Sequence, residues 1–178
     1  MRFSIAFVVA AVLLTACSEK DILETPEPQS LTREAVGYFC GMIVADHEGP
    51  KGQVILRDKT DALWFSSVRD ALAYTRLPEE VDPVAAIYVS DISRAVSWEH
   101  PGAEAWVEIH DAVYVVGSTR KGGMGAPEVA PFSDRSDANL FVERFGGQIL
   151  TLDEVPDDAL LGAWENDDTA YPQEGATQ

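Results

Sequence analysis

The 178-residue chain has few basic residues and few cysteines, and both shortages limit what it can do. Its 13 Lys and Arg stand against 30 Asp and Glu, which gives a formal net charge of -17. A surface of this sign repels phosphate groups, so we expect no nucleic-acid partner. Two cysteines are too few for a disulfide-rich scaffold. The hydrophobic fraction of 46% is ordinary for a globular protein and excludes wholesale disorder.

No hydrophobic run near the N-terminus is long enough to span a bilayer, but the first residues have the composition of an export signal. Arg2 precedes an apolar run of about a dozen residues, whereas a spanning helix needs roughly 20. The run ends at Leu14–Cys17, which resembles the bacterial lipobox. We therefore expect a lipoprotein signal peptide over residues 1–16 and a lipid anchor on Cys17; the alternative is a soluble secreted protein with a chance cysteine. Ser18, rather than Asp, slightly favours the outer membrane.

The two ends of the expected mature chain differ from its middle in composition. Residues 17–36 contain Ser, Glu, Lys and Pro with few apolar residues, which is typical of a flexible linker behind a lipidated N-terminus. Residues 157–178 are acidic and contain no Lys or Arg, which favours a disordered tail. The folded domain is expected over residues 37–156. After cleavage it would hold one free cysteine in an oxidising compartment, and this thiol has no partner for a disulfide.

The expected domain contains two similar segments, Asp58–Phe65 and Asp134–Phe141. They suggest an internal repeat over about residues 37–92 and 104–156. Each segment follows an apolar stretch, and each is predicted to open a helix with Thr60 or Ser136 as the N-cap. The second helix is expected to stop at Gly146-Gly147. The apolar stretches before the two segments are Gln53–Leu56 and Val129–Phe132. The predicted strands are Val84–Val89, Gln148–Leu152, a hairpin of Ala105–Ile109 with Ala112–Val116, and Tyr38–Ala45, which carries Cys40.

These elements favour an α+β fold in which two similar ββαβ units pack as one domain. The alternative is a chance similarity between two helix-capping segments.

The side chains that contain sulfur give the most information about function. In an extended chain Cys40 and Met42 would point to one face. The other methionine expected in the mature chain, Met124, lies in Gly122–Gly125, so glycine flanks all three sulfur residues. Thiolate and thioether ligands select Cu(I), and the set is too poor in sulfur for structural zinc. The alternative is plain core packing, which is common for both residue types. Each histidine could add a nitrogen donor, but the sequence assigns none of them as a ligand: His47, His100 and His110.

Several motifs together resemble the NosL family, the accessory lipoproteins of bacterial nitrous oxide reductase. The motifs are Cys40–Met42, Gly49–Gly52, Tyr114–Ser118, Gly123–Gly125 and Pro131-Phe132, and the resemblance covers about Tyr38–Glu154. It implies a fold of two ββαβ halves and a periplasmic Cu(I) chaperone that helps to mature the copper centres of the reductase. It also implies that Cys40, Met42 and Met124 form the copper site. Two places depart from the family pattern: Tyr38 and Phe39, where some relatives have a histidine, and Ala126–Ala130, which carries an extra residue.

We therefore expect a binding and delivery protein rather than an enzyme. It would be anchored to the membrane in the periplasm, and its partners would be nitrous oxide reductase and the complex that matures it. One alternative is a thiol-dependent hydrolase or lyase with Cys40 as nucleophile and a histidine as base. The family fold is similar to that of organomercurial lyase, but fold does not establish function. Another alternative is a structural lipoprotein with an inert Cys40.

Overall fold

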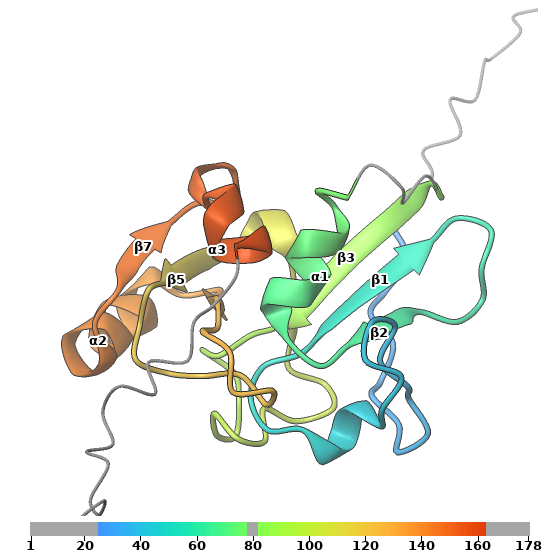
Figure 1. Ribbon diagram of the computed structural model, residues 1–178, viewed down its shortest axis with the longest axis horizontal. Helices are drawn as coiled ribbons and strands as arrows, with labels where there is room; N and C mark the ends of the chain where they lie inside the picture. Colours follow the sequence, from blue (N-terminus) through green and yellow to red (C-terminus); the bar gives the residue numbers. More distant parts are fainter. Residues whose placement is uncertain (1–24, 78–81, 163–178) are drawn as a thin grey trace, which may run out of the picture.

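The computed structural model describes residues 25–77 and 82–162, which form an α+β fold with two small antiparallel sheets (Figure 1). The first sheet has the order β2-β1-β3-β4, with β1 Gly52–Leu56, β2 Leu63–Phe65, β3 Val84–Ser90 and β4 Trp106–Glu108. The second has the order β6-β5-β7, with β5 Val113–Val116, β6 Ala130–Phe132 and β7 Gln148–Leu150. The helices are α1 Val68–Tyr74, α2 Arg135–Phe145, α3 Asp157–Leu161 and the short 3-10 helices η1 Val44–Asp46, η2 Ile109–Asp111 and η3 Leu152–Glu154.

The two halves share one topology. In the first unit, β1 and β2 are followed by α1 and then by β3, and β1 lies in the centre. In the second unit, β5 and β6 are followed by α2 and β7, and β5 lies in the centre. The strand β4 extends the first sheet at its edge. The expected α+β fold with two ββαβ units is therefore confirmed.

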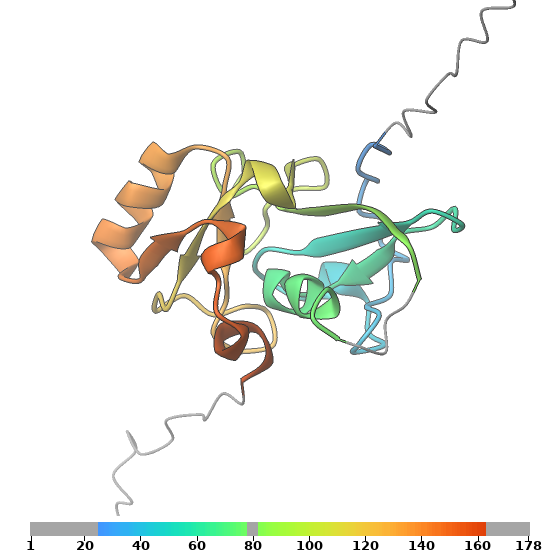
Figure 2. The ribbon, with the colours of Figure 1, turned by 90° about the horizontal axis from the view of Figure 1, so that it is seen from above.

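The elements form layers, because neighbouring residues of a strand point to opposite faces of its sheet. Helix α1 packs between the sheets, where Val54 of β1 and Tyr114 of β5 join one core. Val115 faces the other side and packs under α2. Ile55 faces the outer side of the first sheet, where it is covered by Leu31. Figure 2 shows this succession from α2 through the second sheet and α1 to the first sheet.

The start of the first helix was predicted wrongly. Helix α1 begins at Val68, and its N-cap is Ser67, whose side chain accepts a hydrogen bond from the Asp70 amide. The apolar residues Leu63–Phe65 form β2, because they pair with β1 and so cover the edge of the sheet. In the second unit, the N-cap is Asp134 rather than Ser136, and the helix ends at Gly146 as expected, with a φ of 72°.

The two similar segments therefore do not occupy equivalent places. Asp58–Phe65 forms a loop and β2, whereas most of Asp134–Phe141 is helical. The repeat exists in the fold, but the sequence similarity that suggested it does not follow that repeat.

The predicted hairpin is also wrong. Strand β4 pairs with β3 in the first sheet, and β5 belongs to the second sheet. Between them η2 turns the chain, its Ile109 is buried, and the Tyr114 hydroxyl donates a hydrogen bond of 2.6 Å to the Ile109 carbonyl oxygen. This buried turn carries the chain from one sheet to the other, so a simple hairpin cannot form.

Both ends of the folded part extend beyond the expected limits of 37–156. Residues 26–36, here called the strap, cross the outer face of the first sheet. The Gln29 amide donates a hydrogen bond to the Gln53 Oε1, and the Gln53 Nε2 donates one to the Gln29 carbonyl oxygen. At the other end, α3 packs against α1 with Leu160 only 3% exposed. The described part of the expected linker is thus docked, and the first residues of the expected tail are helical.

The predicted signal peptide, Cys17 and residues 163–178 lie outside the described residues. In the part of the chain that the structure describes, no helix combines the length and apolarity needed to cross a membrane.

Candidate metal centre

Cys40 lies in a tight turn formed by residues 37–43, here called the Cys40 turn. The Gly37 amide donates to the Met42 carbonyl oxygen and the Gly41 amide donates to the Gly37 carbonyl oxygen, both at 2.8 Å. Gly41 has a φ of 65°, which a residue with a side chain rarely adopts. A Cβ placed on Gly37 would lie 2.5 Å from the Cys40 Sγ, so the turn has room for the thiol because residue 37 is glycine.

The strand expected over Tyr38–Ala45 is therefore wrong. Two glycines bend the chain, and η1 follows at Val44. Cys40 and Met42 therefore do not share one face of a strand; they lie in one turn, which a hydrogen bond closes between Gly37 and Met42.

The first unit anchors the Cys40 turn. The Tyr38 amide donates a hydrogen bond of 2.7 Å to the carbonyl oxygen of Trp64 in β2. The rings of Tyr38 and Phe39 pack on Phe65, with centroids 5.8 and 5.2 Å from it. The Cys40 thiol is partly buried, and its Sγ lies 3.8 Å from the Ser66 hydroxyl. The neighbouring group is thus a hydroxyl, whereas a thiol nucleophile is commonly activated by a histidine base.

Met124 lies in a loop of residues 121–127, here called the Met124 loop. A bridge between Lys121 and Pro127 closes the loop, and the Gly122 amide donates to the Ala126 carbonyl oxygen at 3.0 Å. A Cβ on Gly123 would overlap with the Glu48 carbonyl oxygen and lie 2.7 Å from the His47 Cβ. The loop therefore rests directly on the segment that follows the Cys40 turn.

A second contact connects the Met124 loop to the surroundings of the thiol. A Cβ on Gly122 would lie 3.8 Å from the Cβ of Ser67, which is the neighbour of Ser66. Ser66 is the residue beside the Cys40 Sγ. In Figure 1 the connection between β5 and β6 accordingly runs toward the segment that precedes β1. The Met124 loop thus lies against residues 47–49 and Ser67, which are close in the chain to the Cys40 turn and to the Ser66 hydroxyl beside its thiol.

The thioether side chains are not packed as core residues. Met42 is 42% exposed and Met124 is 44% exposed. Val36, Tyr38 and Phe39 are also among the exposed large apolar residues of the described chain. Both methionines are therefore accessible from solvent, unlike methionines that fill a core.

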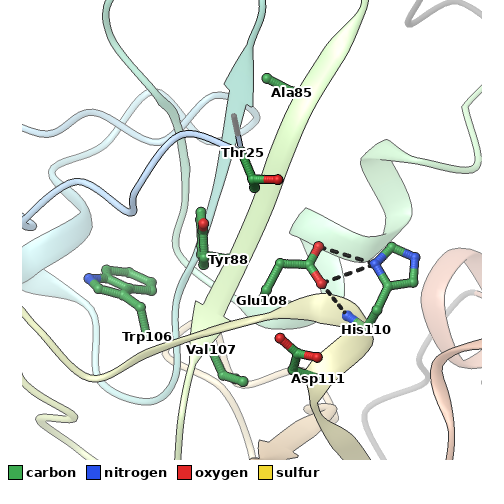
Figure 3. Close-up of a pocket in the computed structure, with 8 residues that line it drawn as sticks. All are labelled: Thr25, Ala85, Tyr88, Trp106, Val107, Glu108, His110 and Asp111. Atoms are coloured by element: carbon green, nitrogen blue, oxygen red, sulfur yellow. Dashed lines mark hydrogen bonds and ion pairs between the residues drawn. The ribbon is translucent and has the colours of Figure 1, made fainter. Parts of the chain in front are cut away.

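The histidines differ in their distance from these loops. His47 is in contact with the Met124 loop through Gly123, and its Nε2 is buried without a hydrogen-bond partner among the described residues. His100 lines the same small cavity of about 160 Å³ as His47. His110 lies elsewhere: its Nδ1 is 3.1 Å from a carboxylate oxygen of Glu108. Figure 3 shows this pair in a cavity of about 650 Å³ beside Tyr88 and Trp106, which no cysteine or methionine lines.

Two buried ionisable residues near the loops, Lys51 and Glu128, were not predicted from the sequence. Lys51 is 4% exposed, and its Nζ donates to the carbonyl oxygens of Glu48 at 2.9 Å and Gly49 at 2.6 Å. Glu128 is 2% exposed, and its Oε1 accepts hydrogen bonds from the amides of Arg69 at 3.0 Å and Val129 at 2.9 Å. In the sequence, the one indication for Glu128 is that its carboxylate directly precedes the apolar stretch that becomes β6.

Burial controls the pKa of both residues. It raises the pKa of Glu128 to about 8, against the lowering effect of its two amide donors and of the Lys51 charge, while the Asp70 charge raises it further. It lowers the pKa of Lys51 to about 8, against the attraction of Glu128 and Glu48. Charges that are this deeply buried are costly unless a specific geometry requires them.

In the described part of the chain, no three His, Cys, Asp or Glu side chains gather in a way that could hold a metal ion. The sulfur side chains carried by the two loops are Cys40, Met42 and Met124, and thiolate and thioether groups are soft donors. His47, which is in contact with the Met124 loop, is the nearby nitrogen side chain.

Comparison with known proteins identifies relatives over nearly the whole chain. The family model NosL matches residues 28–160. The chain is 45% identical over 165 residues to the copper-binding lipoprotein NosL of Achromobacter cycloclastes, covering 90% of this chain and 85% of that protein. It is 36% identical over 155 residues to the copper-binding lipoprotein NosL of Stutzerimonas stutzeri, and this match covers 86% of this chain and 79% of that protein.

The fold also matches a solved structure. The crystal structure of the copper chaperone NosL from Shewanella denitrificans superposes with a TM-score of 0.67 at 31% identity, covering 72% of this chain and 95% of that one. These relatives are named as copper-binding lipoproteins and as a copper chaperone, not as enzymes. The sequence motifs, the two ββαβ units and the match over residues 28–160 agree, and the chain belongs to the NosL family.

Proposed function

We propose that this chain is a Cu(I) chaperone of the periplasm, anchored by a lipid on Cys17, which delivers copper for the maturation of nitrous oxide reductase. Cys40, Met42 and Met124 are its copper ligands. The observation that carries the proposal is the packing of the Met124 loop on residues 47–49, which follow the Cys40 turn in the chain, together with the exposure of both methionines. The names of the relatives support copper as the cargo.

The proposed ligands suit binding and release. A thiolate and two thioethers form a soft set for Cu(I), and Cys40 loses its proton when it binds the metal. The thiol is partly buried, while Met42 and Met124 are 42% and 44% exposed. An incoming donor from the acceptor can therefore approach from the thioether side and take the metal by ligand exchange, without any bond chemistry by the protein.

The acceptor and the location follow from two further features. The resemblance to the NosL family implies an accessory role for nitrous oxide reductase, so the reductase or its maturation complex is the proposed acceptor. The net charge of -17 would help this chain to find a basic docking patch. The resemblance of Leu14–Cys17 to a lipobox supports a location at the periplasmic side of a membrane, and Ser18 slightly favours the outer membrane.

The binding step is tested by an anaerobic Cu(I) competition titration of the domain without Cys17 against a chromophoric chelator. We expect competitive binding by the wild type and its loss in Cys40→Ser. Met42→Leu and Met124→Leu should each weaken binding, and the double variant should lose affinity by orders of magnitude. Leu140→Ala, which changes an exposed apolar residue of α2, is the matched control and should bind as the wild type does.

Two results would overturn the binding proposal. One is a folded wild type with a titratable thiol that does not compete for Cu(I). The other is unchanged affinity in the Met42→Leu, Met124→Leu double variant, which would remove the thioethers from the site.

Delivery needs a separate experiment. In a denitrifying host that lacks the gene for this chain, the full-length wild type should restore nitrous oxide reductase activity and copper content, and Cys40→Ser should not. If Cys40→Ser also restored the reductase activity and copper content, the protein would not act by transferring copper from Cys40, and the delivery proposal would be wrong.

A further inference from the structure

One attachment of the Met124 loop to the first unit is the buried side chain of Glu128. Glu128 directly follows the loop, and its Oε1 accepts hydrogen bonds from the amide of Arg69 in α1 and from the amide of Val129. Arg69 and Glu128 are 59 residues apart in the sequence, and they belong to different units. The carboxylate therefore joins the chain that enters β6 to the first turn of α1.

The other oxygen of the same side chain lies against the loop, without a hydrogen-bond partner among the described residues. A Cβ on Gly122 would lie 2.5 Å from the Glu128 Oε2 and 3.3 Å from its Cδ. Gly122 is not among the glycines with a positive φ, so its backbone does not require glycine. Glycine is needed at this position because the loop lies directly on the carboxylate.

A buried lysine holds the opposite side of the contact. The Lys51 Nζ binds the carbonyl oxygens of Glu48 and Gly49, and Gly123 rests on Glu48. Glu128 and Lys51 thus hold the two backbone segments, the Met124 loop and residues 48–49, that are in contact between the two units.

We propose that Glu128 is the positioning residue of the copper site, because it holds the Met124 loop against the unit that carries Cys40. The inference rests on the proposed function, since it takes Met124 as a ligand. Residues that orient metal ligands contribute about 10–100-fold to metal affinity. We expect a loss of that size when the Glu128 side chain is removed.

The test is a double-mutant cycle with Cu(I) affinity as its readout. Glu128→Ala should weaken binding about 10–100-fold in the wild-type background. In a Met124→Leu background the same change should cost almost nothing, because the ligand that Glu128 positions is already absent. X-ray absorption of the Cu(I) form should show fewer sulfur neighbours in Glu128→Ala, as in Met124→Leu.

Gly122→Ala provides a second route that leaves the Glu128 hydrogen bonds in place. Its Cβ would push the loop away from the carboxylate, so we expect the same loss of affinity and the same absence of effect in the Met124→Leu background. This variant decides the question if Glu128→Ala does not fold. The matched control is Asp91→Asn: Asp91 is fully buried and also connects the two units, through the amide and hydroxyl of Ser133. It should leave the affinity unchanged.

The outcomes separate this inference from the proposed function. If Met124→Leu itself has no effect, Met124 is not a ligand and both ideas fail. If Met124→Leu weakens binding but neither Glu128→Ala nor Gly122→Ala does, only the positioning role is wrong. An equal loss from these changes with and without Met124 would also overturn it, because the effect would then be a general loss of structure.

Discussion

The two ββαβ units share a topology but differ in burial. Every residue of β1 is buried, as are five of the seven residues of α1. In the second unit only Ala138 and Phe141 of the eleven-residue α2 are buried, and no residue of β7 is fully buried. The first sheet is covered by α1 on one face and by the strap on the other, whereas α2 lies at the outside of the molecule. The first unit is thus the more enclosed part of the protein.

The proposed copper ligands do not follow the repeat. Cys40 and Met42 lie in a turn before β1, and Met124 lies between β5 and β6. The topological counterpart of the Met124 loop is the connection of residues 57–62 between β1 and β2, which contains no sulfur. The fold is therefore repeated but the site is not. The enclosed unit supplies two donors on a closed turn, and the outer unit supplies one donor on a glycine loop.

The largest effect that distinguishes the units should come from their aromatic residues. Phe65 is 1% exposed and packs against Phe39 of the Cys40 turn with centroids 5.2 Å apart. Phe65→Ala should cost about 3–5 kcal/mol of unfolding free energy, and it should also weaken Cu(I) binding. Phe141 is 8% exposed and packs against Phe145 with centroids 4.8 Å apart. Phe141→Ala should destabilise the protein by a comparable amount but leave Cu(I) affinity unchanged.

Urea denaturation and the competition titration would measure the two quantities in the same preparations. A Phe141→Ala protein that is folded under the assay conditions but binds Cu(I) as weakly as Phe65→Ala would contradict the difference between the units.

Much of the fold could be predicted from the sequence where one signal dominated. The apolar runs at β1, β3 and β6 and the glycine after α2 were found because no competing pattern overlaps them. At Leu63–Phe65 two patterns compete, since these residues fit both the period of a helix and a strand. Pairing with β1 decides the outcome, and that contact is not local in the sequence. The hairpin of β4 and β5 was predicted wrongly for the same reason. Each strand pairs with strands that are distant in the sequence, β4 in the first sheet and β5 in the second.

The candidate site shows a similar division. Its three sulfur residues could be nominated from their types and flanking glycines. The strand expected for Cys40 was wrong because Gly37 and Gly41 allow a turn that the apolar pattern does not reveal. The role of Glu128 could not be predicted, since its hydrogen-bond partner Arg69 is 59 residues away and belongs to the other unit.

The junction between the units should respond to pH. Burial raises the pKa of Glu128 from 4.5 to about 8, so the folded protein keeps a proton that the unfolded chain releases. Stability should therefore fall as the pH rises from about 5 to 8. The raised pKa of Asp70, also caused by burial, acts in the same direction. Lys51, with a pKa of about 8, stays protonated in both states over most of this range and adds little slope.

Glu128→Gln should remove its share of that slope, and each unit of pKa shift corresponds to about 1.4 kcal/mol. Urea denaturation at a series of pH values checks this expectation. Glu143→Gln, which removes an exposed carboxylate from α2, should run parallel to the wild type. If the stability of Glu128→Gln also changed with pH as the wild type does, the pH dependence would not come from Glu128 at the junction of the units.

The smallest of these effects concerns how each unit is covered on its outer side. An extended strap covers the first sheet, and its position depends on Gln29, which is hydrogen-bonded to Gln53, Thr60 and Ala62. Gln29→Ala removes the side-chain bonds to Thr60 and Ala62, and should cost about 1–3 kcal/mol because the Ala62 amide is left without its acceptor. Gln148→Ala, at an exposed position of β7, should cost much less unfolding free energy.

Cu(I) affinity should stay near the wild-type value in both proteins, since the Cys40 turn has its own hydrogen bonds to Trp64 and within the turn. A large loss of affinity in Gln29→Ala would mean that the strap, and not β2, holds the turn in place.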